Sequence, residues 1–247
     1  MNRFFTKKEN VFADEILIDN PEDVHHINHV LRLKTGAVME ISDSAEWEYT
    51  VRISSVTGDG VRSKILDKQK FSREPEIKIT LFQCLPKQGK MENIIQKSVE
   101  LGVSRIVPVI SARTIAAGHG DFAKKAARWQ KVACEAVKQC RRGVVPEVAG
   151  ATPFSATVDA FGAGGFDMAI FPYENEEKYS IKDALRNIAV SPRTLAVAIG
   201  PEGGYSDEEA EALKAVGAKS VSLGKAVLRT ETAGPAAIAM IMYELEL

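Results

Sequence analysis

The stretch VAIGPEGGYSDEE, residues 197–209, runs from an apolar strand into the acidic start of a helix. Ser206, followed three residues later by Glu209, forms a capping box and predicts where that helix begins. A glycine has no Cβ and tolerates positive φ, so a ligand can approach its backbone closely. A plain turn would need one glycine, whereas this loop holds Gly200, Gly203 and Gly204. The loop is therefore predicted to line a binding pocket.

A second unusual loop follows the next predicted strand, in SLGKAVLRTETAG at residues 222–234. It leaves the strand through Gly224 and places Arg229 and Glu231 just before a helix of small residues, AGPAAIAMI. In open α/β sheets, ligands bind outside the carboxyl ends of the strands. The two loops together predict a small-molecule pocket lined largely by backbone.

Outward from these loops, strands and helices alternate from residue 77 onward. IKITLFQCL (77–85) is predicted as a strand and KMENIIQKSVELG (90–102) as a helix closed by Gly102. Further strands are predicted at 104–110, 168–172, 194–200 and 220–224, with helices at 121–142, from Ser180, from Ser206 and at the C-terminus. This alternation predicts an α/β domain with a mostly parallel sheet.

The N-terminal region has a different rhythm, typical of β structure. EYTVRIS (48–54) alternates apolar and polar residues with the period of a half-buried strand. AVMEIS (37–42) and VRSKIL (61–66) are further strand-like runs, and TGDG (57–60) is a turn signal. We expect a small β-barrel that ends near the polar stretch KFSREPE (70–76). The predicted domains are residues 1–72 and residues 73–247.

Charge is distributed unevenly along a chain whose net charge is only −1. Residues 1–72 carry 10 Lys and Arg against 12 Asp and Glu, residues 73–142 carry 14 against 6, and residues 143–247 carry 8 against 15. The net charges are −2, +8 and −7. On the predicted helix 121–142 one face repeats Lys124, Arg128, Lys131, Glu135, Lys138 and Arg142, with Lys125 and Arg141 beside it. A solvated helix face mixes signs more evenly, so this stripe favours contact with RNA or DNA.

Several other chemistries are disfavoured by the sequence. HHINH (25–29) places histidines at helical spacing but lacks the further ligands of a zinc site, so a surface or RNA-facing cluster is favoured and no metal is expected. KQGKME (87–92) lacks the Ser or Thr and the earlier glycine of a phosphate-binding P-loop. No dinucleotide fingerprint and no nucleophile elbow is present. Three cysteines without a C-x-x-C motif, no apolar run of about 20 residues and no signal-like N-terminus predict a cytoplasmic protein.

At the two glycine-bearing loops the sequence resembles a known family. IGPEGGYSDEE followed by LGKAVLRTETA is similar to the signature of the SPOUT methyltransferases, and more narrowly to the ribosomal RNA small subunit methyltransferase E family. The resemblance covers the whole chain. HVLRLKTG (29–36) matches the N-terminal PUA-like barrel of that family, and residues 90–114 and 135–148 match internal blocks.

The resemblance implies a deep trefoil knot, S-adenosylmethionine as cofactor, a homodimer, and N3-methyluridine in 16S ribosomal RNA as product. It implies cofactor contacts from Ile199, Gly200, Pro201, Glu202, Gly203, Gly204, Leu223, Gly224, Leu228, Thr232 and Ala233. Arg229 is the candidate partner of the uracil anion, and Glu202 and Glu231 are candidate bases or positioning groups. The implied RNA contacts are Arg32 and the cations of the helical stripe.

Two alternatives remain open at the level of sequence. A non-enzymatic RNA-binding factor for ribosome assembly could use the same barrel and stripe, but it would not need two glycine-bearing loops. A SPOUT methyltransferase that acts on another RNA, such as transfer RNA, would share every motif. For Glu231, capping of the last helix is as good an explanation as catalysis.

Overall fold

The computed structural model describes residues 2–71, 73–87, 89–114 and 122–246, which form two compact units. The first unit comprises Met1–Glu74 and Val137–Val145, and the second comprises Pro75–Ala136 and Pro146–Leu247. The sequence placed a boundary at residue 72, which lies outside the described residues. It gave no sign that a later segment returns to the N-terminal unit.

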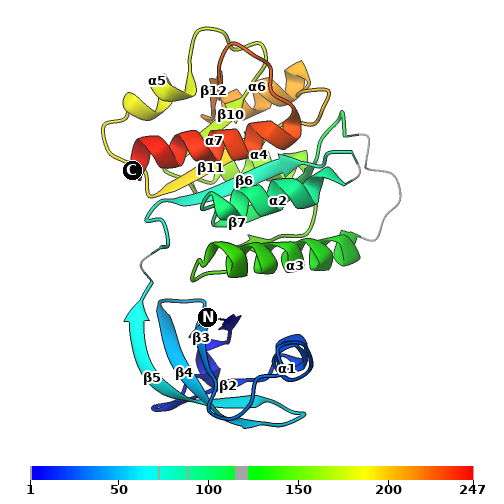
Figure 1. Cartoon of the computed structure of the whole chain (residues 1–247). Helices are drawn as coiled ribbons and strands as arrows, with labels where there is room; N and C mark the ends of the chain where they lie inside the picture. The colour runs from blue at the N-terminus through cyan, green and yellow to red at the C-terminus, as the bar shows by residue number, and fades with distance from the viewer. Residues whose placement is uncertain (1, 72, 88, 115–121, 247) are drawn as a thin grey trace. The chain divides into compact units, whose positions relative to one another are not determined.

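The N-terminal unit is built on a five-stranded mixed sheet (Figure 1). Strand β1 pairs in parallel with β3, and the remaining neighbours in the order β1-β3-β4-β5-β2 are antiparallel. Its strands are β1 (Arg3–Phe5), β2 (Glu15–Ile18), β3 (Val38–Ser42), β4 (Trp47–Val56) and β5 (Val61–Lys70). A 3-10 turn (Lys8–Asn10), helix α1 (Pro21–His25) and a π-helical turn (His26–Val30) complete it. The predicted alternation is confirmed, because Tyr49, Val51 and Ile53 are buried in the core of this unit.

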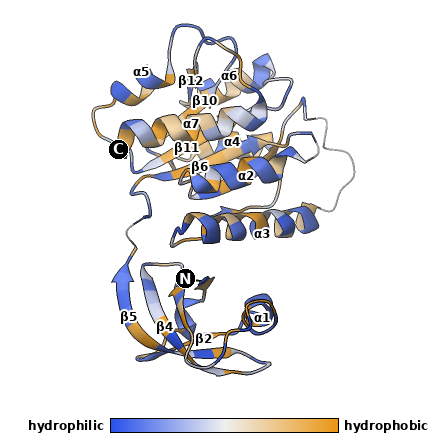
Figure 2. Cartoon of the chain, viewed as in Figure 1, coloured by the Kyte–Doolittle hydropathy of each residue, from blue (hydrophilic) through white to orange (hydrophobic). Residues whose placement is uncertain are grey.

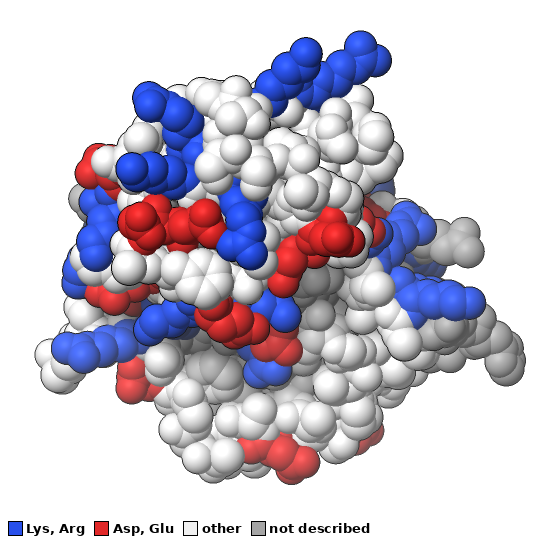
Figure 3. Space-filling model, turned by 90° about the horizontal axis from the view of Figure 1, so that it is seen from below, with Lys and Arg blue, Asp and Glu red and all other residues white. Residues whose placement is uncertain are grey.

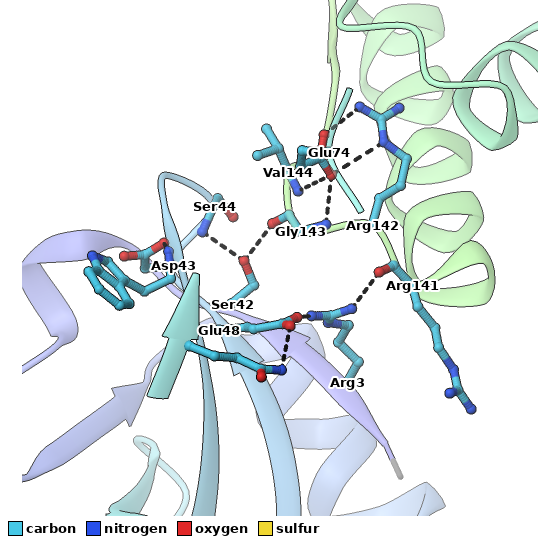
Figure 4. Close-up of polar contacts among 12 residues, drawn as sticks. Arg3, Ser42, Asp43, Ser44, Glu48, Glu74, Arg141, Arg142, Gly143 and Val144 are labelled. Atoms are coloured by element: carbon cyan, nitrogen blue, oxygen red, sulfur yellow. Dashed lines mark hydrogen bonds and ion pairs between the residues drawn. The ribbon is translucent and has the colours of Figure 1, made fainter. Parts of the chain in front are cut away.

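The returning segment of the N-terminal unit is fixed by polar contacts with residues far away in the sequence (Figure 4). Glu74 accepts hydrogen bonds from the backbone N–H groups of Gly143 (2.7 Å) and Val144 (3.0 Å) and forms an ion pair with Arg142 (2.8 Å). The Ser42 hydroxyl donates to the Gly143 carbonyl at 2.5 Å. These contacts join the segment Val137–Val145 to the first unit.

The second unit holds a seven-stranded parallel sheet. Six strands follow the order β12-β10-β11-β6-β7-β8, and β9 also pairs with β7. The strands are β6 (Lys78–Cys84), β7 (Arg105–Ile110), β8 (Glu147–Val148), β9 (Thr152–Pro153), β10 (Met168–Pro172), β11 (Thr194–Ile199) and β12 (Lys219–Val221). Their apolar runs are buried on both faces, as a parallel sheet requires.

Helices cover both faces of this sheet (Figure 1). On one face lie α2 (Lys90–Glu100), α5 (Ile181–Arg186) and α7 (Thr230–Leu245), and on the other lie α4 (Phe154–Gly162) and α6 (Asp207–Ala215). Helix α7 is apolar along most of its length, whereas α2 and α3 (Phe122–Cys140) alternate hydrophobic and hydrophilic positions (Figure 2). The predicted α/β class with a parallel sheet is confirmed.

Helix boundaries follow the predicted signals with one informative exception. The capping box of Ser206 and Glu209 starts α6 as predicted, and Gly102, at φ 100°, follows the end of α2. The helix predicted to run from residue 121, outside the described residues, to 142 ends instead at Cys140. Arg141 then adopts a left-handed φ of 61°, which breaks the helix and turns Arg142 away from its expected face.

Candidate active site

A pocket of about 1110 Å³ lies in the second unit, where β10, β11 and β12 end and α7 begins. Both glycine-bearing loops line it, so the two motifs, which are separate in the sequence, lie together in the structure. Among the predicted site residues its lining contains Ile199, Gly200, Pro201, Glu202, Gly203, Gly204, Leu223, Gly224, Leu228, Arg229, Glu231 and Ala233. Thr232, which the sequence had added to the cofactor contacts, is exposed and not part of the lining.

The three glycines of the first loop differ in backbone φ and in what a Cβ at each position would contact. Only Gly204 has a positive φ, of 68°, and a Cβ there would collide with the carboxylate of Glu174, which also lines the pocket. A Cβ on Gly203 would meet the Arg113 side chain at an ordinary 3.6 Å. On Gly200 it would lie 3.4 Å from Gly204 and the Tyr205 ring. The loop is therefore compact as well as permissive.

Arg113, which follows strand β7, binds the C-terminal part of this loop, at residues 203–205. Its guanidinium donates hydrogen bonds to the carbonyls of Gly203 at 2.8 Å and Tyr205 at 3.1 Å. Glu209 accepts from the backbone N–H of Ala112 at 2.8 Å in addition to its capping role. The loop after β11 is thus held against the loop after β7.

Two successive hydrogen bonds connect the start of the glycine loop, at Gly200, to helix α7 and strand β6. The buried Gln83 side chain on β6 donates to the Thr230 hydroxyl at 3.0 Å, and Thr230 donates to the Gly200 carbonyl at 2.7 Å. Gly234 brings α7 close to this strand, because a Cβ there would lie 3.1 Å from Gln83 Oε1. The carbonyl of Gly200 is therefore fixed in direction.

Lys90, at the start of α2, contacts two of the acidic residues that line the pocket, Glu202 and Glu231. Its ammonium lies 3.1 Å from Glu231 Oε2 and 3.4 Å from Glu202 Oε1, and Glu202 also accepts from the backbone N–H of Lys87 at 2.9 Å. The side chain of Glu231, in the first turn of α7, therefore pairs with Lys90.

These contacts shift the titration of all three groups. Burial raises the pKa of Glu202, but hydrogen bonds from backbone N–H groups of Lys87 and Glu202 itself and from Lys90 outweigh it, so the pKa is lowered. A backbone hydrogen bond within Glu231, followed by Lys90, lowers the pKa of Glu231 despite partial burial. The hydrogen bond to Glu231 is the largest cause that raises the pKa of Lys90. Both carboxyls are thereby held in the charged form.

Arg229 lies at the pocket with a different environment. It is the residue before the first turn of α7, it is exposed, and it lines the pocket. Within the described part of the chain its guanidinium forms no hydrogen bond or ion pair, and Glu231 pairs with Lys90. The guanidinium is therefore available to a ligand.

The predicted RNA-contacting cations fall into exposed and structural groups. Lys124, Arg128, Lys131, Arg141 and Arg32 are exposed, and Lys125 is half-buried. Lys138 pairs with Asp23 at 3.3 Å, with side chains only 20% and 14% exposed. Arg142 is buried against Glu74, so the expectation that it extends an exposed stripe is wrong.

Basic and acidic side chains of the described residues are interspersed in the view of Figure 3. The histidine cluster offers no metal site among the described residues, where no group of three or more possible ligands occurs. His25 and His29 instead place their rings 4.7 Å apart.

In the described ranges no helix is both long and apolar enough to cross a membrane.

Sequence reasoning missed four residues that shape the site: Gln83, Lys90, Arg113 and Glu174. The sequence places Lys90 in a segment that lacks a P-loop and at the start of a predicted helix, but it does not assign it to the site, although Lys90 follows the strand that neighbours β11. The rule that parallel strands end at one edge could have found it. Gln83 carried no such signal, because a glutamine within an apolar strand does not reveal its partner.

Comparisons with known proteins agree with this architecture. The profile of the RNA methyltransferase domain family matches residues 73–242. The ribosomal RNA small subunit methyltransferase E of Bacillus subtilis (strain 168) is 34% identical over 254 residues, which cover 100% of this chain and 98% of that protein. Together the parallel sheet, its pocket and the matched profile define an RNA methyltransferase.

Solved structures extend the likeness over both units. The ribosomal RNA small subunit methyltransferase E of Neisseria gonorrhoeae, bound to S-adenosyl methionine, is similar with a TM-score of 0.82 and 30% identity, covering 98% of this chain and 97% of that one. A methyltransferase from Legionella pneumophila in complex with the same cofactor gives a TM-score of 0.83 at 30% identity, covering 98% and 96%. The chain belongs to the ribosomal RNA small subunit methyltransferase E family.

Proposed function

We propose that this chain uses S-adenosylmethionine to methylate N3 of one uridine in the 16S RNA of the small ribosomal subunit. The observation that carries this proposal is a pocket lined by both glycine-bearing loops, with an available guanidinium, Arg229, at its edge. Its volume of about 1110 Å³ exceeds that of most single-ligand sites, so it has room for a cofactor and a target base. The cofactor-bound relatives of similar fold support the choice of cofactor.

The residues present fit this cofactor. Backbone around Gly200 and Gly224, together with the side chains of Ile199, Leu223 and Leu228, would hold its adenosyl part. The remaining contacts come from the other lining residues of the two loops: Pro201, Glu202, Gly203, Gly204 and Ala233. When bound, the cofactor supplies an electrophilic methyl group on sulfur.

The protein's own task is to orient the base and to stabilise its charge. N3 lies on the Watson–Crick edge, so the uridine must be unpaired or flipped out of its stack. Loss of the N3 proton to solvent water leaves negative charge on O2 and O4, which the Arg229 guanidinium stabilises with a planar fork of donors. The low pKa values of Glu202 and Glu231 make them weak bases, so we assign them a positioning role.

We further propose that the two loops and α7 form the trefoil knot of the SPOUT fold, and that the N-terminal unit is a PUA-like barrel that binds RNA. The exposed cations Lys124, Arg128, Lys131, Arg141 and Arg32, with the half-buried Lys125, would contact phosphates. The hydrogen bond from Thr230 to Gly200 supports the close passage of α7 by the glycine loop.

A homodimer is part of the same proposal. Helix α7 is apolar along most of its length, and one side already packs on the sheet (Figure 2). Its other side carries a stripe at helical spacing, Ala236, Ala239, Met240 and Tyr243, of which Tyr243 is 71% exposed and the other members are partly buried. Such a helix is normally buried, which supports a second copy on this face. Sedimentation of Ala236→Glu against the unmodified protein tests it, and an unchanged molecular mass would contradict it.

Mass mapping of ribosomal RNA tests the function. Cells that lack this protein are expected to lose N3-methyluridine at one position of 16S RNA, and the restored gene should return it. Loss of the nucleotide from transfer RNA alone would favour the other RNA substrate. An intact modification pattern, together with no heat of binding for S-adenosylmethionine, would favour a non-enzymatic assembly factor.

A further inference from the structure

Three charged side chains from three separate segments meet at one edge of the pocket. Lys90 comes from the first residue of α2, Glu202 from the glycine loop and Glu231 from the first turn of α7. Lys90 lies 3.1 Å from Glu231 and 3.4 Å from Glu202, and all three line the pocket. With side chains 30%, 24% and 19% exposed, they are partly withdrawn from water.

Two cations act on the carboxylate of Glu231: Lys90, which pairs with it, and Arg229. Glu231 lies two residues after Arg229, and Arg229 is among the charges that lower the pKa of Glu231. Glu202, by contrast, is already held by the backbone N–H of Lys87 at 2.9 Å. If the ammonium of Lys90 were removed, Arg229 would be the cation nearest in sequence to an uncompensated Glu231.

We infer that Lys90 is a positioning residue for methyl transfer: by pairing with Glu231 and Glu202 it keeps the Arg229 guanidinium available to the target uracil. The inference rests on the proposed function, because it concerns the same pocket and the same transfer. Lys90 touches neither the base nor the methyl group and acts only through the carboxylates.

The alternative is that Lys90 has only a structural role, in which its ion pairs hold α2 against the two loops. The two roles differ in what a second substitution does. If Lys90 keeps Glu231 away from Arg229, neutralising Glu231 makes Lys90 dispensable for the rate. If Lys90 only ties the loops together, neutralising Glu231 removes one more tie and restores nothing. A double-mutant cycle separates these outcomes.

The experiment measures single-turnover methyl transfer to small ribosomal subunits at saturating S-adenosylmethionine for Lys90→Met, Glu231→Gln and the double variant. Lys90→Met is expected to slow transfer about tenfold or more, and Glu231→Gln is expected to slow it by less than Lys90→Met does. The double variant should return to within about threefold of Glu231→Gln. Cofactor affinity by calorimetry should change less than about threefold in all three.

Two further variants keep the test independent of folding. Lys97→Met removes a lysine from the same helix whose partner is the more exposed Glu100, and it should transfer at the normal rate. Lys90→Arg retains the positive charge and should keep most of the rate. Folding of every variant is checked by thermal unfolding.

A double variant as slow as Lys90→Met would overturn the inference, and so would Lys90→Met at the normal rate. A loss in Lys90→Arg equal to that in Lys90→Met would also contradict it. Failure of the unmodified protein to transfer methyl at all would instead refute the proposed function, so the two failures are distinguishable.

Discussion

The carboxylate of Glu74 in the N-terminal unit and those of Glu202 and Glu231 at the pocket bind the same kinds of partner in different surroundings. Glu74 accepts from two backbone N–H groups and pairs with Arg142, with side chains 10% and 6% exposed. At the pocket, the paired side chains are 19–30% exposed. A charged cluster closed off from solvent can only hold the fold, whereas one that borders a pocket can also control which charges meet a ligand.

The largest effect is expected from breaking the buried cluster. Glu74→Gln removes a charge that pairs with the buried Arg142, which costs about 3 kcal/mol or more of unfolding free energy. Urea unfolding measures it. The matched control is Glu147→Gln, whose partner Arg105 is exposed, and there the expected loss is below about 1 kcal/mol. Equal losses in the two variants would show that burial does not distinguish the clusters.

A smaller but specific effect is expected at the pocket from Arg229→Ala. Loss of the charge that is proposed to stabilise the uracil anion should slow single-turnover methyl transfer roughly a hundredfold, the effect of removing one oxyanion donor. Stability and cofactor affinity should stay nearly normal, because the guanidinium forms no hydrogen bond or ion pair within the described chain. Arg229→Lys should recover little, since an ammonium cannot supply the planar fork. Transfer at the normal rate would remove Arg229 from the mechanism.

How far the sequence predicts the two regions differs for the same reason. The pocket loops were found because each depends on local rules: a capping box at Ser206, glycines that follow a strand, and strand ends that share one edge of a parallel sheet. The alternation of strands and helices likewise gave the α/β class, because binary patterning is local.

The contacts that the sequence did not predict depend on residues far apart in the chain. Nothing near Glu74 indicates that it accepts from Gly143, and nothing near Arg142 indicates that the helix ends two residues earlier. The sequence predicts that the helix continues to residue 142, and this prediction placed a buried arginine on an exposed stripe. Lys90 and Arg113 were missed because a lysine or arginine without a motif has no predictable partner.

The helical stripe sharpens the comparison between buried and exposed charge. Reversing the exposed Lys124, Arg128 and Lys131 to Glu should weaken RNA binding by roughly tenfold or more and flatten its salt dependence, with cofactor affinity unchanged. A control with the same change in net charge reverses the exposed Lys182, Arg193 and Lys214. Filter binding over a range of salt concentrations measures both. Equal weakening in the two triple variants would mean that only net charge matters.

The smallest expected effect separates two adjacent glycines. Gly204→Ala places a Cβ at φ 68° and against the Glu174 carboxylate, so cofactor affinity should fall by roughly tenfold. Gly203→Ala meets only the Arg113 side chain at 3.6 Å, and its affinity should fall by less than about threefold. Calorimetry with S-adenosylmethionine measures both variants. The reverse order would mean that the pocket side of this loop has been assigned wrongly.

The most direct measurement of the central claim uses the purified protein, S-adenosylmethionine and small ribosomal subunits from cells that lack the protein. Mass mapping of the 16S RNA after the reaction should find one uridine methylated at N3, and Arg229→Ala should leave that uridine largely unmodified over the same time. A methyl group on another atom of the nucleotide, or an RNA left unmodified by a folded protein that binds the cofactor, would contradict the account.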